Sequence, residues 1–162
     1  MISFDEAVEY MKYKHGDQLR KQGTPYYTHP LEVAYMLREK GLDEEYQIAG
    51  LFHDLLEDTD TTYQEILYMT NDNVAEAVRL VTKEEGYDVE QYYDRIERNN
   101  IARMVKLADR IHNLSEILST DRAFIDKYLA ETKKYFYKLA KGTIFEGDLC
   151  DIIQYVENSI KK

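Results

Sequence analysis

Apolar residues recur at helical spacing along nearly the whole chain. After Ser3 and Glu6, which form a capping-box pattern, the first such face follows at once. No useful stretch alternates between apolar and polar residues, so the pattern predicts no β-sheet. We therefore predict an all-α fold of about eight or nine helices, forming a single domain over residues 1–162.

Capping residues and glycines mark where the expected helices begin and end. A helix that starts near Pro30 should stop at Gly41, and Asp43 is the expected N-cap of the next one. This third helix is expected to run to Thr59, and it is apolar on more than one face, which is typical of a central helix. Later helices are expected at 88–98, 101–114, 122–141 and 148–161.

Charge and composition limit the partners of the chain. It has 162 residues, 31 of them acidic and 21 basic, for a formal net charge of -10. This balance argues against binding to a nucleic acid polymer or an anionic membrane, but it says little about a small anionic ligand. One cysteine, no signal peptide and no apolar span together predict a cytoplasmic protein. The sequence leaves the oligomeric state open.

Both prolines of the chain, Pro25 and Pro30, flank a single histidine, His29. Such a segment is either a rigid connection between helices or a means of holding one side chain still for chemistry. By itself, His29 is more often a loop or core histidine than a metal ligand.

Four polar residues interrupt the apolar third helix near its end: His53, Asp54, Glu57 and Asp58. Imidazole nitrogen and carboxylate oxygen can ligate one metal ion, and burying four such groups is costly unless they bind an ion or one another. The alternative is a solvated helix end. Acidic residues at a helix C-terminus oppose the helix dipole, so this alternative explains Glu57 and Asp58 poorly.

A later apolar helix carries Asp109 and Asn113 one turn apart. Taken alone, Asp109 is best interpreted as the partner of a nearby arginine or lysine. His15 and His112 show no pattern typical of ligands, and we interpret both as structural residues.

Three segments together change this interpretation: GTPYYTHP (23–30), HDLLEDT (53–59) and KLADRIHNL (106–114). They resemble the HD superfamily of metal-dependent phosphohydrolases. More narrowly, they resemble the hydrolase domain of RelA/SpoT-type alarmone enzymes and the small alarmone hydrolases. The similarity runs from about residue 11 to residue 113, and it implies a helical HD-domain fold.

The resemblance also implies roles for individual residues. One divalent ion, typically manganese in this subfamily, would bind to His29, His53, Asp54 and Asp109. The catalytic acidic pair would be Glu57 and Asp58, with Glu57 acting on the attacking water. Substrate contacts would come from Arg20, Lys21 and Asn113.

The implied activity is metal-dependent removal of the 3′-pyrophosphate from guanosine tetra- or pentaphosphate, giving GDP or GTP and pyrophosphate. Two alternatives stay open: hydrolysis of another phosphorylated nucleotide, and a non-catalytic nucleotide sensor. The later helix of the family usually has a tyrosine where this chain has Phe136, flanked by Tyr135 and Tyr137. This difference predicts a nucleotide pocket of different shape.

Overall fold

The computed structural model describes residues 1–162, and its regular elements are helices. Nine α-helices have seven residues or more, and α4 is a single turn, so the predicted all-α fold is confirmed. No helix combines the length and apolar character needed to cross a membrane. The elements are α1 (Phe4–His15), α2 (Thr28–Glu39), α3 (Glu44–Phe52), α4 (Leu55–Asp58), α5 (Tyr63–Met69), α6 (Asp72–Val81), α7 (Val89–Glu97), α8 (Asn100–Ser115), the 3₁₀ turn η1 (Ile117–Ser119), α9 (Arg122–Ala140) and α10 (Glu146–Ile160).

The predicted helix starts agree with the capping contacts. Ser3 and Glu6 form a complete capping box at α1, and the Asp43 side chain accepts a hydrogen bond from the backbone N–H of Glu45 at α3. The helix expected from Pro30 begins two residues earlier, at Thr28. Proline is tolerated there because the first turn of a helix leaves its N–H groups without intrahelical partners.

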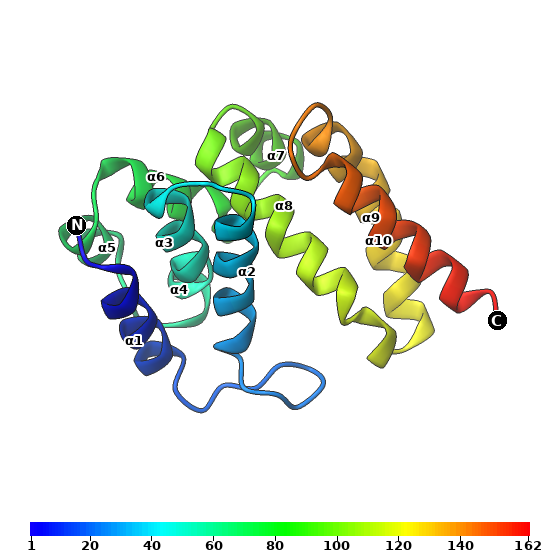
Figure 1. Cartoon of the computed structure of the whole chain (residues 1–162), viewed down its shortest axis with the longest axis horizontal. Coiled ribbons are helices and arrows are strands. Elements are labelled where there is room, and N and C mark those ends of the chain that lie inside the picture. The colour runs from blue at the N-terminus through cyan, green and yellow to red at the C-terminus, as the bar shows by residue number, and fades with distance from the viewer.

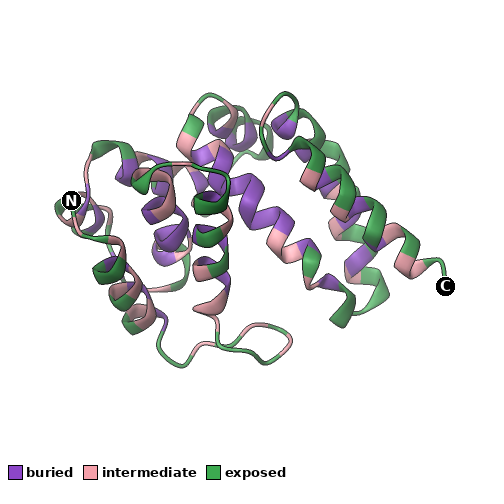
Figure 2. Cartoon of the chain, in the orientation of Figure 1, coloured by how far each residue is buried: buried purple, intermediate pink, exposed green.

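Helix α8 lies in the centre of the molecule, between the α1 to α6 region and the α9–α10 pair (Figure 1). Ten of its 16 residues are buried, and Figure 2 shows this helix as the longest buried stretch. Three of the buried residues are charged: Lys106, Asp109 and Arg110. Charged side chains are rarely buried without a partner, so the middle of α8 is a candidate for function.

Helices α2 and α3 approach each other closely at Gly50. A Cβ atom at this position would lie 2.7 Å from Leu37 Cδ1 and 3.3 Å from Val33 Cγ1. A glycine therefore allows the two helices to pack closely, and this brings the end of α3 next to His29 on α2.

The prediction of one continuous third helix to Thr59 is wrong. Helix α3 ends at Phe52, and α4 begins only at Leu55. Between them the chain makes a turn, in which Asp54 has φ -101° and ψ -1°, at the edge of the right-handed helical region. The regular helix is therefore interrupted at His53 and Asp54, two of the predicted ligands.

Candidate metal and nucleotide site

Three buried side chains from different helices converge at one point. His29 comes from α2, His53 follows α3, and Asp109 comes from α8, with ligand-type atoms that all lie within 4.8 Å of one another. Asp109 Oδ1 is 2.7 Å from His29 Nε2 and 3.4 Å from His53 Nε2. Two atoms bound at right angles to one ion, each at about 2.1 Å, are roughly 3 Å apart. The cluster can therefore hold a divalent metal ion.

A backbone contact fixes the orientation of His53. Its Nδ1 lies 2.7 Å from the carbonyl oxygen of Gly50, which can only accept, so Nδ1 carries the proton. The buried Nε2 atom then faces Asp54 and Asp109, at 3.1 Å and 3.4 Å, and makes no hydrogen bond. Burial lowers the pKa of His53, but the two carboxylates raise it to well above its ordinary value. The geometry thus favours a positive charge beside Nε2, and a metal ion would supply one.

Asp54 lies beside this cluster. Its Oδ2 atom is 3.1 Å from His53 Nε2 and 4.0 Å from His29 Nε2, and it accepts a hydrogen bond of 2.7 Å from the Tyr26 hydroxyl. Burial raises the pKa of Asp54, but the neighbouring His53 lowers it by more, so that the pKa lies below its usual range. The structure therefore brings all four predicted ligands together, three of them within the closest group.

The two predicted catalytic acids differ in position. Glu57 lines the cavity next to the cluster, and its carboxylate accepts a hydrogen bond from the backbone N–H of Lys83. Burial raises the pKa of Glu57 more than this hydrogen bond lowers it. Asp58 does not line this cavity, and its backbone carbonyl accepts a hydrogen bond from the Gln18 side chain.

The cavity beside the cluster has a volume of about 350 Å³. Four cationic side chains line it, despite the negative charge of the whole chain: Lys83, Lys106, Arg110 and Lys127. Lys106 Nζ lies 3.4 Å from Asp109 Oδ2, and Arg110 donates a hydrogen bond of 2.7 Å to Glu131. The cavity thus presents cations to an anionic ligand, and two of these cations are also held by acids of the chain.

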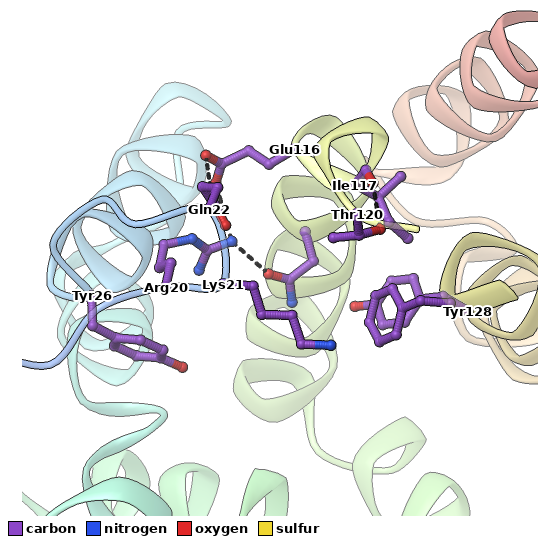
Figure 3. Close-up of a pocket in the computed structure, with 10 residues that line it drawn as sticks. Arg20, Lys21, Gln22, Tyr26, Glu116, Ile117, Thr120 and Tyr128 are labelled. Carbon is purple, nitrogen blue, oxygen red and sulfur yellow. Dashed lines mark hydrogen bonds and ion pairs between the residues drawn. The ribbon is translucent and has the colours of Figure 1, made fainter. Parts of the chain in front are cut away.

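A second cavity, of about 210 Å³, adjoins the first. The two cavities share four lining residues: Tyr26, Asn113, Phe124 and Tyr128. All three predicted substrate-binding residues line the second cavity: Arg20, Lys21 and Asn113. Figure 3 shows Arg20 and Lys21 facing Glu116, Ile117, Thr120 and Tyr128 across it.

Arg20 is held in a fixed position. It donates a hydrogen bond of 3.1 Å to Asn113 Oδ1, and its Nη2 atom lies 3.1 Å from Glu116 Oε1. Its buried Nε atom has no protein partner. Lys21 Nζ lies 3.5 Å from the centre of the Phe124 ring. A planar guanidinium on one side of the cavity and aromatic rings on the other suit the binding of a planar base between them.

The aromatic wall of the cavities was not predicted. Phe124 and Tyr128 belong to α9 and stack on each other with ring centres 5.5 Å apart. Their spacing of four residues was the available signal, but the same spacing is typical of ordinary packing. The Tyr135 to Tyr137 segment lines neither cavity, and Phe136 is fully buried.

His112 is the other residue whose surroundings could not be predicted. Its Nδ1 lies 2.7 Å from His29 Nδ1, and its Nε2 lies 3.2 Å from Glu116 Oε1. Burial, together with the His29 ring, lowers the pKa of His112 to about 4. His112 is not part of the metal-type cluster, but it contacts one of its members directly.

A helical fold with a buried cluster of histidines and aspartates that can hold a metal ion is typical of HD-domain proteins, and the comparison with protein families agrees. Residues 7–143 match the HD domain family, so the chain belongs to that family.

Two curated relatives carry the same enzyme name. It is 38% identical over 142 residues to a guanosine-3′,5′-bis(diphosphate) 3′-pyrophosphohydrolase of Aquifex aeolicus, covering 83% of this chain and 20% of that protein. It is 34% identical over 138 residues to a probable enzyme of the same name from Synechocystis, covering 78% of this chain and 18% of the relative. The chain therefore spans about a fifth of the length of these curated relatives.

Two solved structures share the fold. One is a metazoan ortholog of SpoT that hydrolyzes ppGpp and plays a role in starvation responses; the TM-score is 0.80 at 27% identity, and the match covers 94% of each chain. The other is lmo0812 from Listeria monocytogenes, with a TM-score of 0.65 at 25% identity over 83% of this chain and 98% of that one.

Proposed function

We propose that this protein hydrolyses the 3′-pyrophosphate of guanosine tetra- or pentaphosphate in a metal-dependent reaction, giving GDP or GTP and pyrophosphate. One observation carries the proposal. A cavity lined by His29, Asp109 and several cations adjoins a cavity that contains Arg20 and aromatic rings. A nucleotide with phosphates on its ribose needs both compartments: a flat one for its base and a cationic one for its phosphates. The names of the relatives point to the same substrate.

The proposed ligands are His29, His53, Asp54 and Asp109, and the proposed metal ion is Mn²⁺. Two imidazole nitrogens and two carboxylates form a mixed donor set that suits manganese, iron or zinc. When bound, the ion would activate water and polarise a phosphoryl oxygen. The protein would supply the remaining positioning and proton transfer.

Glu57 is the proposed general base. It lines the cavity beside the His–Asp cluster. Its raised pKa makes it a stronger base than an ordinary carboxylate. Asp58 lies on the same helical turn but outside the cavity, and its charge is among those that raise the pKa of Glu57. We assign Asp58 a supporting electrostatic role.

Arg20, Lys21 and Asn113 would bind the nucleotide. Arg20 presents a planar guanidinium whose position is fixed by Asn113, and the ammonium of the neighbouring Lys21 reaches Phe124 on the opposite side of the cavity. Lys83 and Lys127 would contact the phosphates, because neither forms a salt bridge within the chain.

The test is product analysis with the purified protein, Mn²⁺ and guanosine tetraphosphate, beside a panel of other phosphorylated nucleotides. GDP and pyrophosphate should appear in equal amounts. The variant Glu57→Gln keeps the size of the side chain but not its basicity, and we expect its kcat to fall about 10²- to 10⁴-fold. No turnover of the wild type with Mn²⁺, Fe²⁺ or Zn²⁺ would refute the proposal. Preferential turnover of another nucleotide would favour the alternative substrate, and tight binding without turnover would favour a sensor.

A further inference from the structure

We propose that His112 is a positioning residue that fixes the protonation and orientation of the metal ligand His29. This inference rests on the metal site of the proposed function. It starts from an unusual contact, in which the Nδ1 atoms of two imidazole rings lie 2.7 Å apart. A hydrogen bond at that distance needs one donor and one acceptor, so only one of the two Nδ1 atoms carries the proton.

The contacts of the Nε2 atom of each ring determine which Nδ1 carries the proton. His29 Nε2 faces the cluster and donates to Asp109 Oδ1 at 2.7 Å; a metal ion would take the place of this proton, because a ligating Nε2 is unprotonated. The proton of His29 must then be on Nδ1, where it donates to His112 Nδ1. The acceptor role leaves the His112 proton on Nε2, which faces the Glu116 carboxylate at 3.2 Å. The tautomer of His29 that a metal ion requires therefore sets that of His112, and the nearby Glu116 carboxylate favours the His112 proton on Nε2 by its charge.

The nearly coplanar arrangement of the two rings supports this role. Their centres are 4.9 Å apart at an interplanar angle of 25°, as expected for two rings joined edge to edge by this hydrogen bond, which limits rotation of the His29 ring. Glu116 lies within 3.1 Å of Arg20 as well, which connects the nucleotide cavity to the same chain of contacts. His29 is the only member of the cluster that is oriented by another histidine, since His53 is oriented by a backbone carbonyl.

Two substitutions separate positioning from packing. His112→Phe keeps a planar ring but removes the acceptor, and we expect Mn²⁺ affinity, measured by titration calorimetry, to fall roughly 10- to 100-fold. His112→Asn has an oxygen near the former Nδ1 position and should stay within about threefold of wild type. Ser115→Ala is the matched control, because it removes a hydrogen bond to the His112 backbone carbonyl without touching the ring. Affinity of the Phe variant equal to wild type would overturn the proposal, and so would equal loss in the Phe and Asn variants.

A measurement on the wild-type protein keeps the proposal testable if the Phe variant does not fold. In Zn²⁺-loaded, ¹⁵N-labelled protein, long-range ¹H–¹⁵N spectra should show His112 protonated on Nε2 alone and His29 protonated on Nδ1. A proton on His112 Nδ1 would overturn the assignment. Wild-type protein that binds neither Mn²⁺ nor Zn²⁺ would contradict the proposed function itself, whereas metal binding with the wrong tautomer contradicts only the role of His112.

Discussion

The buried pair of Lys106 and Asp109 gives a prediction that can be worked out from the structure. Their charged atoms are 3.4 Å apart, and both residues are only 8% exposed. At an effective dielectric constant of about 20, two unit charges at this distance attract by about 5 kcal/mol, and most of this offsets the cost of burying them. Burial lowers the pKa of Lys106, while Tyr92 and Asp109 raise it to well above its ordinary value. The ammonium therefore stays charged as long as its partner is present.

Replacing only Asp109 should be costly. In Asp109→Asn, Lys106 loses its carboxylate, and we expect unfolding free energy to fall by about 3–5 kcal/mol. For a chain of this size that corresponds to a decrease in Tm of roughly 6–20 °C. The double variant Lys106→Met and Asp109→Asn removes both charges and keeps an apolar side chain at position 106. It should recover at least about 2 kcal/mol relative to Asp109→Asn.

The assay is urea denaturation of the wild type, both single variants and the double variant, with a chelator present so that metal binding does not contribute. The exposed pair of Lys133 and Glu157 is the matched control. Its atoms are closer, at 2.7 Å, but the two side chains are 41% and 34% exposed, so its coupling energy should be below about 1 kcal/mol. A coupling energy at Lys106 and Asp109 no larger than that of the control would refute the reasoning.

The pH dependence of Asp109→Asn gives a second check on the same pair. Without the carboxylate, burial continues to lower the pKa of Lys106 while Tyr92 alone of its two main raising partners remains, and we expect the folded-state pKa to fall below its value of about 10.4 in the unfolded chain. The unfolded state then binds more protons, so the stability of this variant should fall as the pH decreases from about 10. The double variant should not show this dependence, and an identical pH profile for the two would contradict the explanation.

Three further predictions concern the site. Arg20→Lys keeps the charge but not the flat face, so the KM for the nucleotide should rise about tenfold with little change in kcat; an effect confined to kcat would contradict a binding role. Mn²⁺ at 100 times its Kd should stabilise the protein by about 2.7 kcal/mol, seen as an increase in Tm of roughly 5–11 °C that a chelator reverses. Tyr26→Phe removes the hydroxyl that donates to Asp54, and Mn²⁺ affinity should fall about 10- to 100-fold. Unchanged affinity would argue against Asp54 as a ligand.

The helices could be predicted well because their signals are local. The capping box at Ser3 and the cap at Asp43 depend only on neighbouring residues, so a sequence pattern contains all the information needed. The break after Phe52 could not be predicted in this way. It coincides with a side-chain hydrogen bond from His53 to Gly50, in a glycine-dependent contact between α2 and α3 that is not visible in the spacing of apolar residues.

The site shows the same division. The residues that the motifs name do come together around His29, Asp54 and Asp109, although their roles remain proposals. Two residues complete the surroundings: Tyr128 on α9 lies outside these motifs, and His112 on α8 lies within KLADRIHNL, but the resemblance gave it no role. An aromatic residue four positions from another, or a histidine on an apolar helix, is usually ordinary packing. Only the arrangement of α8 against α2 and α9 brings these side chains to the cavities.

Helix α8 also explains why the net charge of -10 is a poor guide to the ligand. It places Lys106 and Arg110 on the cavity wall, and each is balanced by a nearby acid, so neither changes the overall charge seen from far away. Within a few ångströms of the cavity the cations are what a ligand meets, because screening limits the reach of the acids outside to about 8–10 Å. An apolar α8 would fold with fewer buried charges to compensate. The charged residues in its buried middle are therefore best explained by what the cavity has to bind.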